Sequence, residues 1–185
     1  IFVGDSKNNT FDGVDGSDTV DYSNLSNNAN IEVNLSSSVA TVNGKALSAN
    51  KAIVNSSTID TDTLYNIENI KGTIYSDIIV GNDSNNTLIG NDGNDILRGN
   101  AGDDSLIGGN GIDTADYSNA TEDLDVNIID GTKFISTSQG TDYFSSIEGI
   151  IGGSGNDKLT GNSKANTLIG NDGNDILDGA GTSTA

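Results

Sequence analysis

Apolar residues recur once every nine positions along much of this chain, and glycine and small polar residues fill the gaps. The stretch "LIGNDGNDIL" occupies both Leu88–Leu97 and Leu168–Leu177. Nine-residue blocks of this kind begin at ten glycines: Gly4, Gly13, Gly72, Gly81, Gly90, Gly99, Gly108, Gly152, Gly161 and Gly170. With the glycine as position 1, position 8 is always apolar: Phe11, Val20, Ile79, Leu88, Leu97, Leu106, Ala115, Leu159, Leu168 and Leu177. Such a period is typical of stacked repeats, in which a unit buries its apolar residue only against its neighbours.

Each block predicts a turn followed by a short strand. Its first six residues are rich in Gly, Asn and Asp, which tolerate positive φ and close backbone approach. The last three residues form a strand whose middle side chain, position 8, points inward. We therefore expect an all-β chain whose position-8 residues line one interior column.

Two segments, 22–62 and 117–142, lack the nine-residue block but resemble each other. Each is entered through a similar stretch, "DTVDYSN" at Asp18–Asn24 and "DTADYSN" at Asp113–Asn119. Tyr22 and Tyr117 fall in these stretches, and we expect them to fill the interior with their hydroxyls at the surface. The segments are too short to bury much core alone, so we interpret them as excursions of the same stack.

Both segments predict strands and a hairpin. The runs Ile31–Leu35 and Leu124–Ile129 alternate apolar and polar residues, which indicates half-buried strands. Two dipeptides typical of tight hairpin turns, Asn43-Gly44 and Asp130-Gly131, are flanked by apolar residues. The segments then rejoin the blocks through related stretches, "TDTLYNIENI" and "TDYFSSIEGI".

The chain therefore divides into five parts. The predicted parts are a short repeat tract (1–21), a strand and hairpin segment (22–62), a metal-binding tract (63–116), a second strand and hairpin segment (117–142) and a second tract, cut short at its end (143–185).

The amino-acid composition narrows the range of partners and functional sites that this chain could have. The chain has 27 acidic and 8 basic residues, a net charge of −19, and neither His nor Cys. The negative charge disfavours nucleic acid as a partner. The sequence contains no apolar run of about 18 residues, so it does not predict a membrane-spanning helix. Without His or Cys there is no disulfide, no catalytic triad built on His, and no zinc site of imidazole or thiolate ligands.

Position 6 is Asp or Asn in every block, so stacking the blocks would place carboxylates about 5 Å apart. Such carboxylates repel strongly unless a positive charge lies between them. A site made only of carboxylate and carbonyl oxygens suits a hard cation of the size of Ca²⁺.

The block closely resembles the nonapeptide G-G-x-G-x-D-x-U-x of the RTX (repeats-in-toxin) calcium-binding proteins. The resemblance implies a right-handed parallel β-roll with two nonapeptides per coil and several Ca²⁺ ions. Each ion would lie between one turn and the turn two blocks later. It would be held by both position-6 side chains, by carbonyls 2 and 4 of the earlier turn, and by carbonyls 1 and 3 of the later turn.

Transferred to this sequence, the resemblance implies four sites with these oxygen donors. One site uses Thr73, Tyr75, Asp77, Gly90, Asp92 and Asp95, and the next uses Asn91, Gly93, Asp95, Gly108, Asn110 and Asp113. A third uses Asn82, Ser84, Asn86, Gly99, Ala101 and Asp104, and a fourth uses Gly153, Gly155, Asp157, Gly170, Asp172 and Asp175.

Glu68 and Glu148 each precede a position-6 aspartate by nine residues and are further candidates, facing Asn86 and Asn166. The alternative is a solvated glutamate between two core isoleucines. The carbonyl donors implied at these two sites are Asn66, Gly81, Asp83, Ser146, Gly161 and Ser163, and Asp18 is a candidate in the first tract. The sites with Asn86 or Asn166 should be weaker because an amide carries no charge. Lys164 fits poorly beside a cation, and the Gly4 block is the poorest candidate.

These observations favour a calcium-induced folding module of a large secreted or surface-attached bacterial protein, resembling an adhesin. The alternatives are a module that recognises a glycan or other surface target, or a calcium-binding region appended to a secreted enzyme or toxin. We expect no catalysis, because metal spacing accounts for the acidic clusters. We expect a monomeric fragment of a larger chain, at the cell surface or outside the cell.

Overall fold

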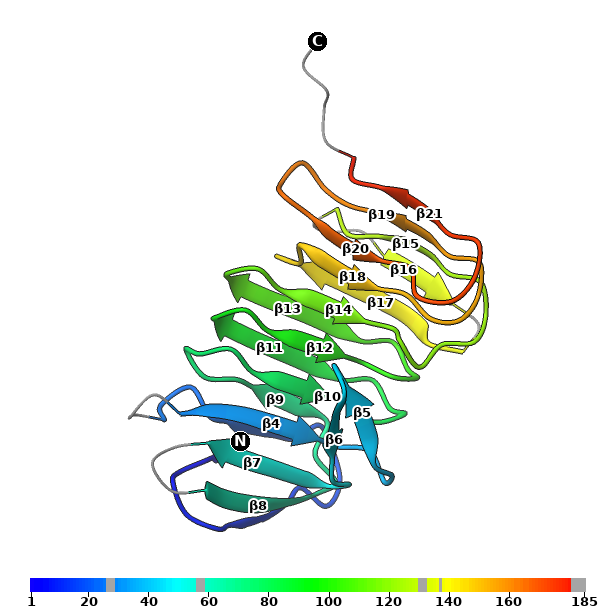
Figure 1. Cartoon of the computed structure of the whole chain (residues 1–185). Coiled ribbons are helices and arrows are strands. Elements are labelled where there is room, and N and C mark those ends of the chain that lie inside the picture. Colours follow the sequence, from blue (N-terminus) through cyan, green and yellow to red (C-terminus); the bar gives the residue numbers. More distant parts are fainter. Residues whose placement is uncertain (26–28, 56–58, 130–132, 137, 181–185) are drawn as a thin grey trace.

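A computed structural model shows a chain built of strands and turns (Figure 1). It describes all residues except 26–28, 56–58, 130–132, 137 and 181–185. The all-β prediction is confirmed. Within the described part, no helix is long and apolar enough to cross a membrane.

In the described part of the chain, twenty-one strands form four sheets. The seven-stranded first sheet consists, in spatial order, of β1 (Phe2–Val3), β3 (Thr19–Asp21), β9 (Asn69–Lys71), β11 (Thr87–Asp92), β13 (Ser105–Asn110), β17 (Gly140–Ser145) and β16 (Lys133–Ser136). The nine-stranded second sheet consists of β2 (Thr10–Asp12), β8 (Ile59–Tyr65), β7 (Lys51–Asn55), β4 (Asn30–Asn34), β10 (Ile78–Val80), β12 (Ile96–Arg98), β14 (Thr114–Asp116), β18 (Gly149–Ile151) and β20 (Thr167–Ile169). The third sheet consists of β15 (Asp125–Asn127), β19 (Lys158–Thr160) and β21 (Ile176–Asp178), and the fourth of β5 (Ala40–Val42) and β6 (Lys45–Leu47).

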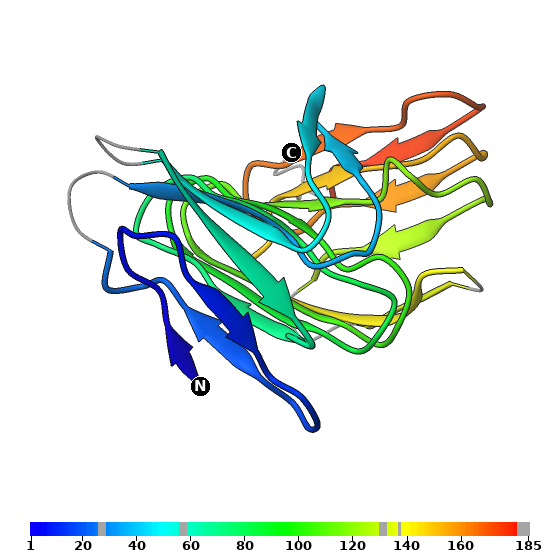
Figure 2. The ribbon, with the colours of Figure 1, turned by 90° about the horizontal axis from the view of Figure 1, so that it is seen from below.

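In the central tract the strands alternate between the first and second sheets. Strand β11 lies in the first sheet, β12 in the second, β13 in the first and β14 in the second. Neighbours within a sheet run parallel and are 18 residues apart, as in the pairs Leu88↔Leu106 and Ile79↔Leu97. Two nonapeptides therefore complete one circuit of the stack, and Figure 2 views the molecule along the stack.

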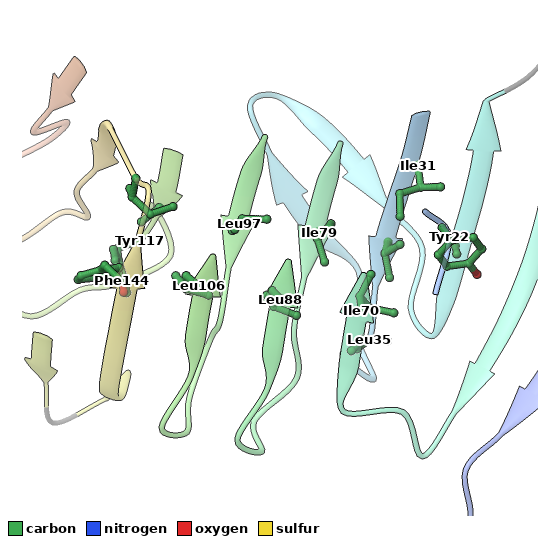
Figure 3. Close-up of a cluster of buried hydrophobic side chains, with 14 of the residues drawn as sticks. Tyr22, Ile31, Leu35, Ile70, Ile79, Leu88, Leu97, Leu106, Tyr117 and Phe144 are labelled. Atoms are coloured by element: carbon green, nitrogen blue, oxygen red, sulfur yellow. The ribbon is translucent and has the colours of Figure 1, made fainter. Parts of the chain in front are cut away.

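The position-8 side chains form a continuous core between the two large sheets. Ile79, Leu88, Leu97 and Leu106 are fully buried and follow one another along the row in Figure 3. The row does not hold in the last block, where Leu177 is 49% exposed. The inward prediction is thus correct for the central tract and wrong for Leu177, because no strand covers β21 on its far side among the described residues.

The last three turns of the central tract have positive φ at positions 2 and 4. In the Gly90 block these are Asn91 (φ 82°) and Gly93 (φ 124°). A Cβ on Gly93 would lie 2.8 Å from the carbonyl oxygen of Tyr75, in the turn 18 residues earlier. Glycine at this position therefore lets successive turns approach each other closely.

The segments between the tracts make both large sheets mixed. Strand β7 pairs antiparallel with β4 and with β8, and β16 pairs antiparallel with β17. The hairpin predicted at Asn43-Gly44 is confirmed, because β5 and β6 pair antiparallel around it and both residues have positive φ, 48° and 75°. The predicted turn at Asp130-Gly131 lies outside the described residues.

The alternating run Ile31–Leu35 is buried on both faces, so the prediction of a half-buried strand is wrong here. Ile31 and Val33 face the main core, while the β5–β6 hairpin covers the opposite face (Figure 1). There Glu32 Oε1 pairs with Lys45 and accepts Nδ2 of Asn55 (2.8 Å), whereas its Oε2 is buried without a hydrogen-bond partner. In the run Leu124–Ile129 the expected alternation holds, with Val126 buried and Asp125 exposed.

The identical ten-residue copies provide a test of core packing. In saturating calcium, Leu97→Ala should lower the free energy of unfolding by about 2–5 kcal/mol, because it opens a cavity in a closed core. Leu177→Ala removes the same group from the same local sequence at a half-exposed position, so its effect should be well below that of Leu97→Ala. Urea unfolding of both variants measures the difference, and equal losses would contradict this description of the core.

Candidate metal sites

The strand register stacks the position-6 residues into columns at the edges of the sheets. Each position-6 residue of the nonapeptide blocks directly precedes a strand, and Asp142 lies in the same register within β17, so paired strands bring these residues into line. The column of the first sheet contains Asp18, Glu68, Asn86, Asp104 and Asp142. The column of the second sheet contains Asp77, Asp95, Asp113, Glu148 and Asn166, and that of the third sheet contains Asp157 and Asp175. Glu68 and Glu148 therefore lie in register with Asn86 and Asn166, as expected.

In most steps of the columns, the backbone N–H of one member donates to a side-chain oxygen of the next. The N–H of Asp77 donates to Asp95 Oδ1 (2.8 Å), and that of Asp95 donates to Asp113 Oδ1 (2.9 Å). The same bond joins Asn86 N to Asp104 Oδ1 (2.8 Å) and Asp157 N to Asp175 Oδ1 (2.9 Å). One carboxylate oxygen of each later residue is thus occupied by the preceding turn.

The second carboxylate oxygen, Oδ2, has a hydrogen-bond partner in some turns and none in others. In turns that begin a tract, it accepts the N–H of position 2, as Asp77 Oδ2 does from Thr73 (2.6 Å) and Asp157 Oδ2 from Gly153 (2.8 Å). In the later turns of the central tract, Asp95, Asp104 and Asp113 each keep a buried Oδ2 without a hydrogen-bond partner. Buried carboxylate oxygens without a partner carry a large desolvation penalty, so these three positions call for a positive ligand.

Oxygen atoms of two turns meet beside the position-1 glycines. A Cβ on Gly90 would contact Asp95 Oδ2 and lie 2.7 Å from the carbonyl oxygen of Gly108. A Cβ on Gly72 would lie 2.5 Å from Asp77 Oδ2 and 2.7 Å from the carbonyl oxygen of Gly90. Other position-1 glycines likewise lie beside a side-chain oxygen and a carbonyl oxygen. These oxygen pairs are Asn86 with Gly99, Asp113 with Ser146, Asp157 with Gly170, and Asp18 with Asn66. The space that a side chain would fill is therefore lined by oxygens from both turns.

A sequence profile of the RTX calcium-binding nonapeptide repeat matches four regions of the chain, residues 1–24, 66–95, 80–115 and 151–182. Together they cover more than half of the sequence. The chain belongs to the RTX nonapeptide-repeat family. No individual curated protein matches it.

The RTX repeat binds calcium, and the residues present fit that ion. All the donors are oxygens, which calcium prefers, and they include the unpartnered Oδ2 atoms of Asp95, Asp104 and Asp113. Burial is the main cause that raises the pKa of Asp95 and of Asp104 to about 8, and the neighbouring carboxylates Asp77 and Asp113 contribute to this rise at Asp95. These groups are therefore held in a site that lacks positive charge.

Some of the implied RTX ligands already have other partners. The Gly81 carbonyl accepts Nδ2 of Asn100 (2.7 Å), and the Asn110 carbonyl accepts the N–H of Gly93 (2.9 Å). Among the described residues, no three acidic side chains gather into one group that could hold a metal ion. Calcium ligation by all the residues named in the sequence analysis stays a prediction, including that by Asp83, Asp92, Ala101, Ser163 and Asp172.

Glu148 has a protein cation beside it. Lys164 Nζ lies 2.6 Å from Glu148 Oε1, while Glu148 Oε2 accepts the N–H of Asp113 (3.1 Å). The lysine that fitted poorly in the sequence thus neutralises the glutamate. A calcium ion at Glu148 and Asn166 would have to compete with this ion pair.

Two aspartates lie at position 6 outside the regular blocks and were not identified from the sequence: Asp142 in the column of the first sheet, and Asp62 on β8, which forms a separate pair with Asn9 at the start of β2. Asp142 Oδ1 accepts the N–H of Asp104 (3.0 Å), and Asp62 Oδ1 accepts that of Asn9 (2.8 Å). Two residues further on, Leu64 and Phe144 are buried where position 8 would be. The signal was the shared aspartate of "TDTLY" and "TDYFS", which lies outside the regular blocks.

The raised pKa values predict how the metal-free protein responds to pH. Burial raises the pKa of Asp95 and Asp104 to about 8 and of Asp77 and Asp113 to about 6, against about 3.9 in an unfolded chain. The folded state thus binds protons more tightly. The resulting stability is fully present below about pH 4 and is lost as the pH rises through about 6 to 8.

In calcium-free buffer, we expect the chain to keep structure that resists urea at about pH 5, whereas at about pH 8 it should be largely unfolded before urea is added. In calcium, the order should reverse, because the metal requires deprotonated carboxylates. Circular dichroism during urea titration measures both. Greater stability of the metal-free chain at the higher pH would contradict the burial of these carboxylates.

Proposed function

We propose that this chain is a calcium-dependent folding module of a large secreted or surface-attached bacterial RTX protein, resembling an adhesin. The observation that supports it most is the set of three buried carboxylate oxygens without a partner, at Asp95, Asp104 and Asp113. They lie where two turns approach, and their repulsion opposes folding unless it is neutralised.

The side chains and carbonyls that we expect to hold calcium come from consecutive turns of one column. Asp77 and Asp95 would share one site, Asp95 and Asp113 the next, and Asn86 and Asp104 a site on the other sheet. A bound calcium ion supplies the positive charge that these oxygens lack. The nearby glycines keep side chains out of the space, and the backbone N–H bonds hold the carboxylates in line.

The folding behaviour follows from charge and core. A net charge of −19 opposes compaction, and one apolar residue per nonapeptide supplies a thin core. The chain would stay unfolded where free calcium is scarce and fold outside the cell, where calcium approaches the roughly 10⁻⁴–10⁻³ M dissociation constants of extracellular modules. Export of an unfolded chain by type I secretion suits such a switch.

The proposal also covers the handedness of the fold and the absence of catalytic activity. The 18-residue parallel register of the tracts is what a parallel β-roll requires, and we propose the right-handed form. We also propose that the module has no catalytic activity, since the buried carboxylates lie at metal spacing along the columns.

The direct test is a count of bound calcium per chain, by equilibrium dialysis and elemental analysis. We expect several ions at millimolar free calcium, and none after equal treatment with magnesium alone, which prefers smaller octahedral sites. A chain that binds no calcium under these conditions would refute the proposed function.

A further inference from the structure

Two buried tyrosines lie at the ends of the central core. Tyr22 follows β3 and Tyr117 follows β14, and Figure 3 shows them at opposite ends of the row of aliphatic side chains. They are 0% and 1% exposed, so the prediction that their hydroxyls lie at the surface is wrong. Each hydroxyl instead donates to a carboxylate, Tyr22 to Asp62 Oδ2 (2.8 Å) and Tyr117 to Asp142 Oδ2 (2.6 Å).

These two carboxylates differ from their counterparts in the tract. Like Asp95, Asp104 and Asp113, each accepts on Oδ1 the N–H of the preceding column member. Unlike those three, each also has a donor on Oδ2, which is the tyrosine hydroxyl. Asp62 and Asp142 therefore have both oxygens satisfied by the protein.

The tyrosines join the two large sheets. Tyr22 follows a strand of the first sheet and reaches Asp62 on β8 of the second, whereas Tyr117 follows a strand of the second sheet and reaches Asp142 on β17 of the first. The two copies thus make the same hydrogen bond from tyrosine to aspartate, once from the first sheet to the second and once from the second sheet to the first. Its repetition with the sheets exchanged indicates a built feature of the fold.

The surroundings hold each ring in place. A Cβ on Gly4 would overlap the Tyr22 ring, and Tyr117 packs edge-on against Phe134, with ring centroids 5.0 Å apart. The backbone N–H of Tyr22 donates to the carbonyl oxygen of Lys71, and that of Tyr117 donates to the carbonyl oxygen of Ile151, with N···O distances of 2.8 Å in both cases. Burial raises the pKa of the Tyr117 hydroxyl well above its usual value, so it remains a hydrogen-bond donor.

We infer that Tyr22–Asp62 and Tyr117–Asp142 are metal-free links in the columns, in which a tyrosine hydroxyl occupies the carboxylate oxygen that is left for calcium at Asp95, Asp104 and Asp113. The inference rests on the proposed function only in taking calcium as the ligand of those three residues. The links attach the segments between the tracts to the stack without adding a calcium site.

The first test compares calcium counts of two isosteric variants in the same column. Asp104→Asn should lower the count or weaken binding, because Asp104 has the unpartnered oxygen. Asp142→Asn should leave the count and the affinities unchanged. If Asp142→Asn loses one ion, the inference is overturned while the proposed function stands; if the unmodified chain binds no calcium, it is the proposed function that fails.

The second test measures the link itself in saturating calcium. Tyr117→Phe leaves Asp142 Oδ2 buried without a donor, so the unfolding equilibrium constant should rise about 10- to 100-fold, with the calcium count unchanged. In a double-mutant cycle with Asp142→Asn, the two effects should be clearly non-additive. Tyr143→Phe, at a 40% exposed position on the same strand as Asp142, should have little effect on stability. Additive effects, or a Tyr117→Phe variant as stable as the Tyr143→Phe control, would refute the link.

Discussion

Removing calcium is expected to abolish most of the β-sheet circular dichroism signal of this chain. The buried carboxylates of the columns would then face one another without positive charge, in a molecule of net charge −19. The two tyrosine links and the single aliphatic residue of each nonapeptide are too few to offset this repulsion. A chain with so little apolar burial and so much charge is unfolded by default.

The measurement is a far-ultraviolet spectrum at about pH 7.5, before and after excess chelator, followed by restored calcium. We expect a largely unfolded spectrum in chelator and full recovery with calcium. Recovery with magnesium alone would point to general charge screening, and an unchanged spectrum in chelator would show that the stack holds without metal.

Replacing Asp95 should have the largest effect of any single carboxylate, because it is expected to serve two calcium sites, one shared with Asp77 and one shared with Asp113. Its Oδ1 accepts the N–H of Asp77, and its own N–H donates to Asp113. Asp95→Ala should therefore weaken two neighbouring calcium sites, which would appear as two fewer ions bound at a fixed calcium concentration.

Two controls separate position from local sequence. Asp175 lies in the second copy of "LIGNDGNDIL" and contacts only Asp157 in its column, so Asp175→Ala should affect one site. Asp123 is exposed and accepts the N–H of Asn156 (2.7 Å) outside the columns, so Asp123→Ala should leave calcium affinity nearly unchanged. Isothermal titration calorimetry of the three variants decides the matter. Equal losses at Asp95 and Asp123 would contradict sharing of ions along the column.

Periodicity predicted the central tract well. The nine-residue spacing of Gly and position 8 follows directly from one turn and one strand per block, so the inward residues from Ile79 to Leu106 could be identified. The position-6 columns followed from the same spacing. Local residue preference and stacking agree in this tract, and its pattern is therefore readable without a structure.

The segments between the tracts were harder to predict because their pairing depends on distant residues. The alternation of Ile31–Leu35 gives no sign that the β5–β6 hairpin covers its polar face. Asp62 and Asp142 could not be placed because the block spacing is lost before them. The tyrosine hydroxyls were placed at the surface since their acceptors, 40 and 25 residues away, could not be identified from sequence alone.

The alternation of strands between the two large sheets determines what happens when such a chain changes in length. An insertion of two nonapeptides adds a full circuit and returns every later strand to its own sheet. An insertion of one nonapeptide would move each later strand to the opposite sheet, including both β14 and β17, so Tyr117 and Asp142 would still face each other. An odd or even number of added repeats therefore decides which large sheet carries the second segment, and its tyrosine link is compatible with either.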